Sequence, residues 1–161
     1  MTDERFVTAQ AIAACPFSIA EDYAREYLQR AEGGGAEAAV RVPIRFLPPI
    51  AQRRVDLTFG LFTDVVEGGR PHNEIHLRWS ARSPLLPSFA GTLRFRIEGS
   101  GTLLSLAGSY HVPMGSFGAA FDRALGARIA GASVSDFLGR LAASLETREQ
   151  EWRTRAELVT P

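Results

Sequence analysis

The 161-residue chain has one cysteine, no lysine and no net charge, and each of these shortages excludes a class of protein. Cys15 has no second cysteine to pair with, so neither an internal disulfide nor a cysteine-rich zinc site can form. All 18 basic residues are arginine, which excludes Schiff-base chemistry and a Walker-type phosphate loop. Since the 18 acidic residues balance them, we expect no nucleic-acid partner.

Long hydrophobic runs are also missing. No stretch reaches the ~20 apolar residues of a membrane helix, and the first residues are polar rather than arranged as a signal peptide. We therefore expect a cytoplasmic protein without a membrane span. The length suits one domain over residues 1–161, with a core at about 5–148 and a polar tail at 149–161.

The first part of the chain predicts a strand, a helix and a glycine loop. Arg5–Ala13 alternates, with Phe6 and Ile12 on one side. Ser18 is expected to be the N-cap of a helix that ends near Ala31, in a capping box with Glu21. The glycines at 33–35 end this helix.

Residues 40–112 then alternate with a period of two, which predicts an antiparallel sheet. Expected strands cover Val40–Leu47, Val55–Val66, Glu74–Arg82, Leu93–Glu98 and Thr102–Val112, with a turn over Glu67–Asn73 and a loop over Ser83–Gly91. Arginines on these strands alternate with acidic residues, so cross-strand ion pairs are expected on the outer face.

The last part of the chain has helical periodicity. Apolar residues recur at steps of three and four from Phe117 to Leu145, and the helix extends to about Arg153. Gly131 or Ser133 could mark a kink or a close approach. Glu149 and Arg153 are spaced for an ion pair on a solvated helix end. An exposed Trp152 would indicate contact with another chain, such as a second copy in a homodimer.

The later half of the sequence resembles a known superfamily. The segments Pro87-Ser88-Phe89-Ala90-Gly91, Gly108-Ser109-Tyr110, Pro113-Met114-Gly115 and Asp122-Arg123-Ala124-Leu125-Gly126 are similar to motifs at the end of small START/polyketide-cyclase (SRPBCC, Bet v-like) proteins. The resemblance covers about Pro87–Leu145 and is topological before that. Family members usually have two short helices after the first strand, whereas this sequence predicts one.

This resemblance implies an α+β helix-grip fold, in which a curved antiparallel sheet wraps around a long C-terminal helix. It also implies an internal cavity for a hydrophobic small molecule such as a lipid, a polyketide-like or an aromatic compound. The superfamily contains binders and enzymes, so the fold does not determine the activity. We expect binding without a cofactor. A polyketide cyclase or dehydratase is the first alternative, and a protein-interaction module with a filled core is the second.

Candidate site residues follow from the alternation and the motifs. The expected ligand-binding residues are Phe59, Leu61, Leu77, Trp79, Phe95, Tyr110, Phe117, Phe121 and Leu125. The candidates for acid–base catalysis are His76, Arg78, Tyr110 and His111.

For each candidate a structural role is the simpler interpretation. His76 and His111 would face solvent, and Tyr110 would tie the last strand to the helix. Glu74, His76 and Arg78 would line the cavity only if their strand face were the concave one. His72 is expected in a solvated turn. The three histidines show no metal-ligand spacing, so no metal site is predicted.

Overall fold

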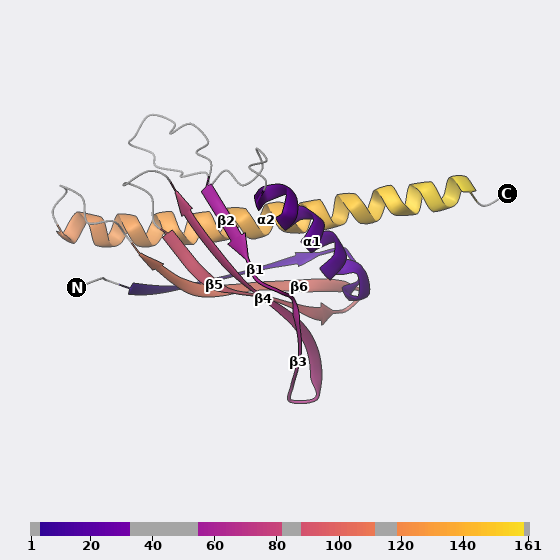
Figure 1. Cartoon of the computed structure of the whole chain (residues 1–161), viewed down its shortest axis with the longest axis horizontal. Helices are drawn as coiled ribbons and strands as arrows, with labels where there is room; N and C mark the ends of the chain where they lie inside the picture. The colour runs from indigo at the N-terminus through magenta and orange to yellow at the C-terminus, as the bar shows by residue number, and fades with distance from the viewer. Residues whose placement is uncertain (1–3, 33–54, 82–87, 112–118, 160–161) are drawn as a thin grey trace.

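The computed structural model describes residues 4–32, 55–81, 88–111 and 119–159 (Figure 1). Its elements are β1 (Glu4–Ala13), α1 (Phe17–Glu32), β2 (Val55–Phe59), β3 (Thr63–Glu67), β4 (Arg70–Ala81), β5 (Ser88–Glu98), β6 (Gly101–His111) and α2 (Ala119–Val159). The strands pair antiparallel in the order β1-β6-β5-β4-β2, and β3 pairs with β4. In Figure 1 the long α2 crosses one face of this curved sheet, as the helix-grip prediction requires.

The inner face of the sheet is built from alternating apolar residues. Ile75, Leu77 and Trp79 of β4 are buried, whereas His76 and Arg78 between them are exposed. The same alternation gives β6 its buried Leu104 and Leu106. Since successive strand residues point to opposite faces, the apolar set of each strand reaches the core as predicted.

β1 turns its larger apolar residues outward. Phe6 and Ile12 are exposed, whereas Val7, Ala9 and Ala11 form the inner side of the strand, which ends in the buried Ala13. α2 packs against β1 along this side. The small side chains on this inner side allow α2 to approach the strand closely. The predicted alternation was correct, and the larger apolar residues of the strand lie on its outer side.

α2 is a continuous helix of 41 residues that ends at Val159, six residues beyond the predicted end. Val134, Leu138, Leu141 and Leu145 are fully buried on its sheet-facing side. No break occurs at Gly131 or Ser133, and a Cβ placed on Gly131 would meet nothing within 4 Å. A close approach at Gly131 is therefore not found.

Three strand boundaries differ from the predicted ones. The expected strand Val55–Val66 is two strands, β2 and β3, interrupted after Phe59. Gly68 and Gly69 alone form the turn into β4, both with positive φ, a conformation that glycine adopts without steric cost. β5 begins at Ser88, within the expected loop. The predicted strand Val40–Leu47 lies outside the described residues.

α1 is one helix, but its start differs from the predicted one. The carbonyl of Pro16 accepts hydrogen bonds from the amides of Ile19 and Ala20, so the helix begins at Phe17 and Ser18 lies inside it. Glu21 closes no capping box. Its carboxylate instead accepts hydrogen bonds from Arg25 at 2.6 Å and from Asn73 of β4 at 2.7 Å.

Candidate functional site

A small internal cavity lies between the sheet and α2. It has a volume of about 10 Å³, about the space of one water-sized probe. Its lining comes from three strands and one helix: Trp79, Ser88, Phe89, Tyr110, Ala130, Ser133 and Val134. Ser88 and Tyr110 stand at or next to the ends of described segments.

Aromatic rings form a row that passes through this wall. Trp79 stacks on Phe89 with ring centroids 4.2 Å apart and an interplanar angle of 22°. Phe137 of α2 contacts Trp79 at 5.3 Å and Tyr27 of α1 at 6.3 Å. Such offset and edge contacts are favourable beyond the area they bury. The row therefore joins β5, β4, α2 and α1 across the core.

Two facing glycines make room for the ring of Phe89. Gly91 of β5 pairs with Gly108 of β6, and a Cβ on Gly108 would stand 2.5 Å from the Gly91 Cα and 2.7 Å from the Phe89 Cζ. Real Cβ atoms do not come this close to other heavy atoms. The glycines of the P-x-F-x-G and G-x-Y motifs therefore let the two backbones meet beneath the ring that stacks on Trp79.

The structure brings part of the predicted ligand-binding set to the interior. Leu77, Trp79, Phe95 and Tyr110 are buried, and Phe59 is partly buried against the core. Trp79 and Tyr110 line the cavity. Leu61 follows β2 and is 83% exposed, so it does not face the interior. Phe117 and the side chains of Phe121 and Leu125 lie outside the described part of the chain.

Sequence reasoning missed five lining residues: Ser88, Phe89, Ala130, Ser133 and Val134. The position of Phe89 in the P-x-F-x-G motif and its cross-strand pairing could have indicated it, because it stands opposite both Trp79 and Tyr110. Ser88 lies in the segment expected to be a loop. The three helix residues have small side chains, and periodicity alone does not separate a cavity wall from packed core.

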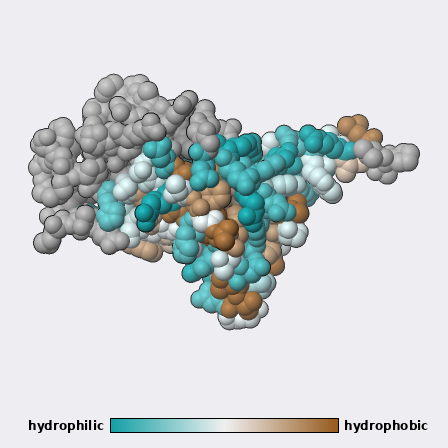
Figure 2. Space-filling model, in the orientation of Figure 1, coloured by the Kyte–Doolittle hydropathy of each residue, from teal (hydrophilic) through white to brown (hydrophobic). Residues whose placement is uncertain are grey.

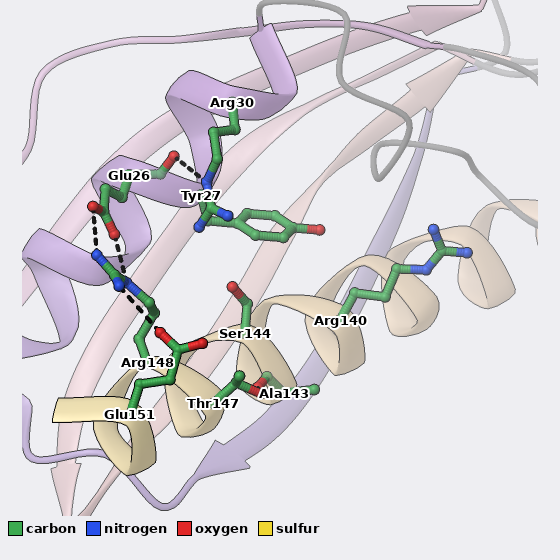
Figure 3. Close-up of a pocket in the computed structure, with 9 residues that line it drawn as sticks. All are labelled: Glu26, Tyr27, Arg30, Arg140, Ala143, Ser144, Thr147, Arg148 and Glu151. Carbon is green, nitrogen blue, oxygen red and sulfur yellow. Dashed lines mark hydrogen bonds and ion pairs between the residues drawn. The ribbon is translucent and has the colours of Figure 1, made fainter. Parts of the chain in front are cut away.

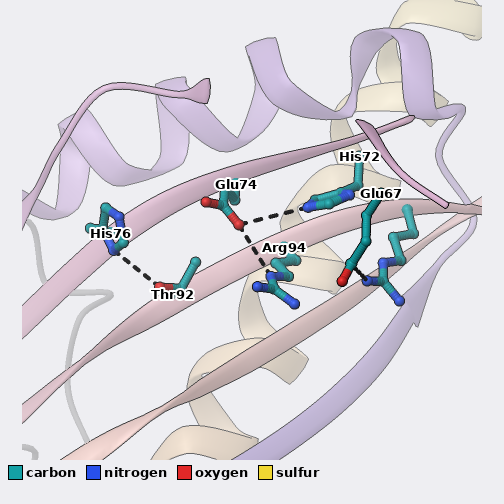
Figure 4. Close-up of polar contacts among 7 residues, drawn as sticks. Glu67, His72, Glu74, His76, Thr92 and Arg94 are labelled. Carbon is teal, nitrogen blue, oxygen red and sulfur yellow. Dashed lines mark hydrogen bonds and ion pairs between the residues drawn. The ribbon is translucent and has the colours of Figure 1, made fainter. Parts of the chain in front are cut away.

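The structure does not bring all four catalytic candidates to one site. His76 and Arg78 lie on the outer face of β4, so the arrangement in which Glu74, His76 and Arg78 line the concave face is not found. Figure 4 shows His76 beside Thr92, and Glu74 between His72 and Arg94. His111 is partly buried at the end of β6. Among the four candidates, only Tyr110 lines the described cavity.

His72 corrects one prediction. It is 2% exposed and lies within β4 rather than in a solvated turn. Its Nε2 is 3.7 Å from a carboxylate oxygen of Glu74, and the same oxygen accepts a hydrogen bond from Arg94 at 3.2 Å. Arg96 likewise pairs with Glu67 at 3.1 Å. These contacts confirm the expected cross-strand charge pairs on the outer face.

A polar groove of about 600 Å³ separates α1 from the C-terminal half of α2 (Figure 3). Arg148 crosses it, donating to the two carboxylate oxygens of Glu26 at 2.7 and 2.8 Å and to Glu151 at 3.2 Å. Hydrogen bonding from Arg148 lowers the pKa of Glu26. Since its guanidinium is engaged by two carboxylates, Arg148 serves here to join the helices.

Cys15 stands just before α1, near Glu149 of α2, and is fully buried. Burial raises the pKa of its thiol to about 11, and the nearby Glu149 adds to this shift. Glu149 is 4% exposed and accepts a hydrogen bond from Arg153 at 2.6 Å. The predicted ion pair is therefore confirmed, although Glu149 is buried rather than solvated.

The described residues contain neither a metal-ligand cluster nor a membrane-spanning helix. No three His, Cys, Asp or Glu side chains among them are placed to hold a metal ion. No described helix is both long and apolar enough to span a membrane.

Comparison with known proteins identifies the fold. No family model and no curated protein matches the sequence. The structure is similar to the Zhui aromatase/cyclase from Streptomyces sp. R1128, with a TM-score of 0.52 and 16% identity over 90% of this chain and 95% of that one. A protein of Thermus thermophilus gives a TM-score of 0.52 and 18% identity over 89% and 99% of the two chains.

A third similar structure is the di-domain ARO/CYC StfQ of the steffimycin biosynthetic pathway. It gives a TM-score of 0.52 and 15% identity, and it covers 91% of this chain and 52% of that chain. Matches at such low sequence identity show a shared fold and do not show a shared activity. The six-stranded antiparallel sheet, its long C-terminal helix and these matches show that the chain has the α+β helix-grip fold.

Proposed function

We propose that the chain binds a hydrophobic small molecule between the sheet and α2. One observation carries the proposal: the cavity bounded by the stacked rings of Trp79 and Phe89. Tyr110 and Ser133 add hydroxyl groups to this apolar wall. Ligand sites commonly combine apolar and aromatic walls with a few polar groups that orient the ligand.

The size of the described cavity limits how a ligand can bind there. About 10 Å³ is far below the several hundred Å³ of an ordinary ligand site. A ligand larger than water must therefore displace a wall side chain or extend past the described residues.

Catalysis of the cyclase type is the second candidate function. Proton transfer in such an enzyme needs groups within hydrogen-bond reach of the substrate. Tyr110 is the catalytic candidate that lines the cavity, so this alternative depends on its hydroxyl. If Tyr110→Phe abolished turnover of a linear polyketide while ligand affinity persisted, catalysis would replace simple binding as the function.

The binding proposal can be tested with a matched pair of helix variants. Ala130 of α2 lines the cavity, and Ala127, almost one turn earlier on the same helix, is exposed. Ala130→Leu fills the cavity, whereas Ala127→Leu adds the same side chain outside it. The probe is anilinonaphthalene sulfonate, an amphipathic dye that binds exposed apolar surface, followed by its fluorescence. Native mass spectrometry of the protein as purified detects any ligand that copurifies.

We expect saturable dye binding in the original chain and in Ala127→Leu, and at least about tenfold weaker binding in Ala130→Leu. A bare protein mass together with no saturable dye binding would contradict the proposal and favour the interaction module with a filled core. Equal dye binding by both variants would place the apolar site elsewhere and would also overturn the proposed location.

A further inference from the structure

The outer face of the sheet has a shallow depression that the proposed ligand site does not use. It has a volume of about 490 Å³ and lies over β2, β4 and β5. Thr58, His76, Arg78 and Thr92 line it with polar side chains, and Ala90 is also part of the lining. All these residues stand on the side of the sheet opposite to the buried Leu77 and Trp79.

The register of the strands explains why the depression forms. Thr58 of β2 pairs with Arg78 of β4, which pairs in turn with Ala90 of β5. In the next outward-facing row, His76 pairs with Thr92, and the amide of Gly60 donates to the carbonyl of His76 at 3.0 Å. The longest side chains, those of His76 and Arg78, therefore stand on the middle strand β4, and the shorter residues Thr58, Ala90 and Thr92 leave open space on either side of them.

The charges around the depression are of one sign. None of the described residues that line it is acidic. The neighbouring Glu74 is held by Arg94 at 3.2 Å, and among the described residues no carboxylate lies within ion-pair distance of the Arg78 guanidinium. The two outer-face arginines of β5 have carboxylate partners, since Arg94 pairs with Glu74 and Arg96 with Glu67. Arg78 differs from both.

His76 is oriented by a second residue. Its Nδ1 is 3.0 Å from the Thr92 hydroxyl, and the two side chains project to the same side of the sheet (Figure 4). When the hydroxyl donates to Nδ1, the neutral imidazole carries its proton on Nε2. Nε2 is then a hydrogen-bond donor on the exposed side of the ring, next to the row of Arg78.

We propose that this depression binds an oxyanion of the phosphate type through Arg78 and His76, with Thr92 as the positioning residue of the imidazole. The guanidinium supplies two parallel donors that match two oxygens of one anion, and Nε2 of His76 supplies a third. The site lies on the opposite face of the sheet from the hydrophobic cavity, so it is independent of the proposed function.

The test is a titration with inorganic phosphate followed by amide and imidazole nuclear magnetic resonance, at constant ionic strength. We expect saturable shifts of the Gly60 and Gly91 amides, which border the depression, while the Gly139 amide on α2 stays unchanged. Arg78→Gln and His76→Asn should each weaken binding by about tenfold. Thr92→Val should weaken it less and should change the tautomer signal of His76.

The matched control is Arg96→Gln, which removes a paired outer-face arginine that does not line the depression. We expect its phosphate affinity to stay within about twofold of the original. Titrations with acetate and chloride separate a phosphate site from a general carboxylate site and from simple screening. Non-saturable shifts equal to those of chloride, or unchanged affinity in Arg78→Gln, would overturn the proposal.

Discussion

Single residues decide how closely the strands of this sheet approach each other. Gly91 and Gly108 face each other so closely that a Cβ atom on either one would overlap the Cα of the other. Gly139 of α2 provides the opposite case, since a Cβ there would meet nothing within 4 Å. The two kinds of glycine should therefore respond to alanine with opposite signs.

We expect Gly108→Ala to lower the free energy of unfolding by about 2 kcal/mol or more, because the new methyl group overlaps backbone atoms of β5. Gly139→Ala should raise it by about 1 kcal/mol, because alanine favours a helix over glycine. Urea denaturation of the two variants measures both effects. A Gly108→Ala protein as stable as the original would show that β5 and β6 do not meet this closely.

The thiol of Cys15 is expected to be inert in the folded protein. Burial raises its pKa to about 11, so near neutral pH the thiol is protonated and also inaccessible, while the thiolate is the reactive form. A chromogenic disulfide reagent should label the native chain far more slowly than the urea-unfolded one. Rapid stoichiometric labelling of native protein would contradict the buried position.

At the scale of the elements, Arg148 joins the two helices. Its pair with Glu26 connects residues far apart in sequence, and the guanidinium lowers the pKa of the carboxyl. A lowered folded-state pKa stabilises the protein above the unfolded value, and this contribution disappears as the pH falls through the folded value. Both side chains are partly exposed, so the effect should be small.

Glu26→Gln should therefore reduce stability slightly near neutral pH and leave it unchanged in acid, where the carboxyl of the original chain is also protonated. Parallel urea titrations at the two pH values measure this difference. Glu32→Gln is the control, because Glu32 is an exposed residue of the same helix. A stability difference that grew towards acid would have the wrong sign for this ion pair.

The elements also show how far the sequence predicts the fold. Alternation located β4 and β6, because alternate residues are buried from Ile75 to Trp79 and from Thr102 to Tyr110. It failed at β2 and β3, where the pattern continues through Gly60, Leu61 and Phe62 although the backbone leaves the sheet. Leu61 was expected inside for this reason. Periodicity shows which residues are apolar, but the path of the backbone determines which of these residues are buried.

The candidate site was less predictable than the fold. Trp79 and Tyr110 were expected on the wall, but Ala130, Ser133 and Val134 were not. A cavity forms where side chains leave space unfilled. In the sequence, small residues on the apolar side of a helix give the same pattern whether they border a cavity or pack in the core. The pairing of Gly91 with Gly108 was also not predictable, because the alternation within one strand does not show which residue of the neighbouring strand stands opposite.

At the scale of the whole molecule, the C-terminal end of α2 projects beyond the sheet and α1 (Figure 1). Every described side chain from Gln150 to Leu158 is exposed, and Trp152 is 60% exposed. Figure 2 shows hydrophobic atoms near this end and at the tip of the β3–β4 hairpin, where Leu158 and Val66 respectively are exposed. Neither region contributes to the core.

A chain that ends at Thr154 should be as stable as the full chain, within about 0.5 kcal/mol, because it keeps the pair between Glu149 and Arg153. Urea denaturation checks the stability, and light scattering checks the mass in solution. If the full chain is a dimer through Trp152, Trp152→Ala should make it monomeric. A large loss of stability on truncation would show that the projecting end packs against part of the protein.

The pairing of β1 with β6 has a consequence for how the chain folds during synthesis. Glu4 lies opposite His111, and α2, the last element, packs on the same first strand. β1 leaves the ribosome before β6 and α2, so it must wait for both of them before it can be covered. Such sequence-distant closure slows folding and leaves apolar strand faces open meanwhile. A growing chain of this protein should therefore depend on chaperones until β6 and α2 have emerged.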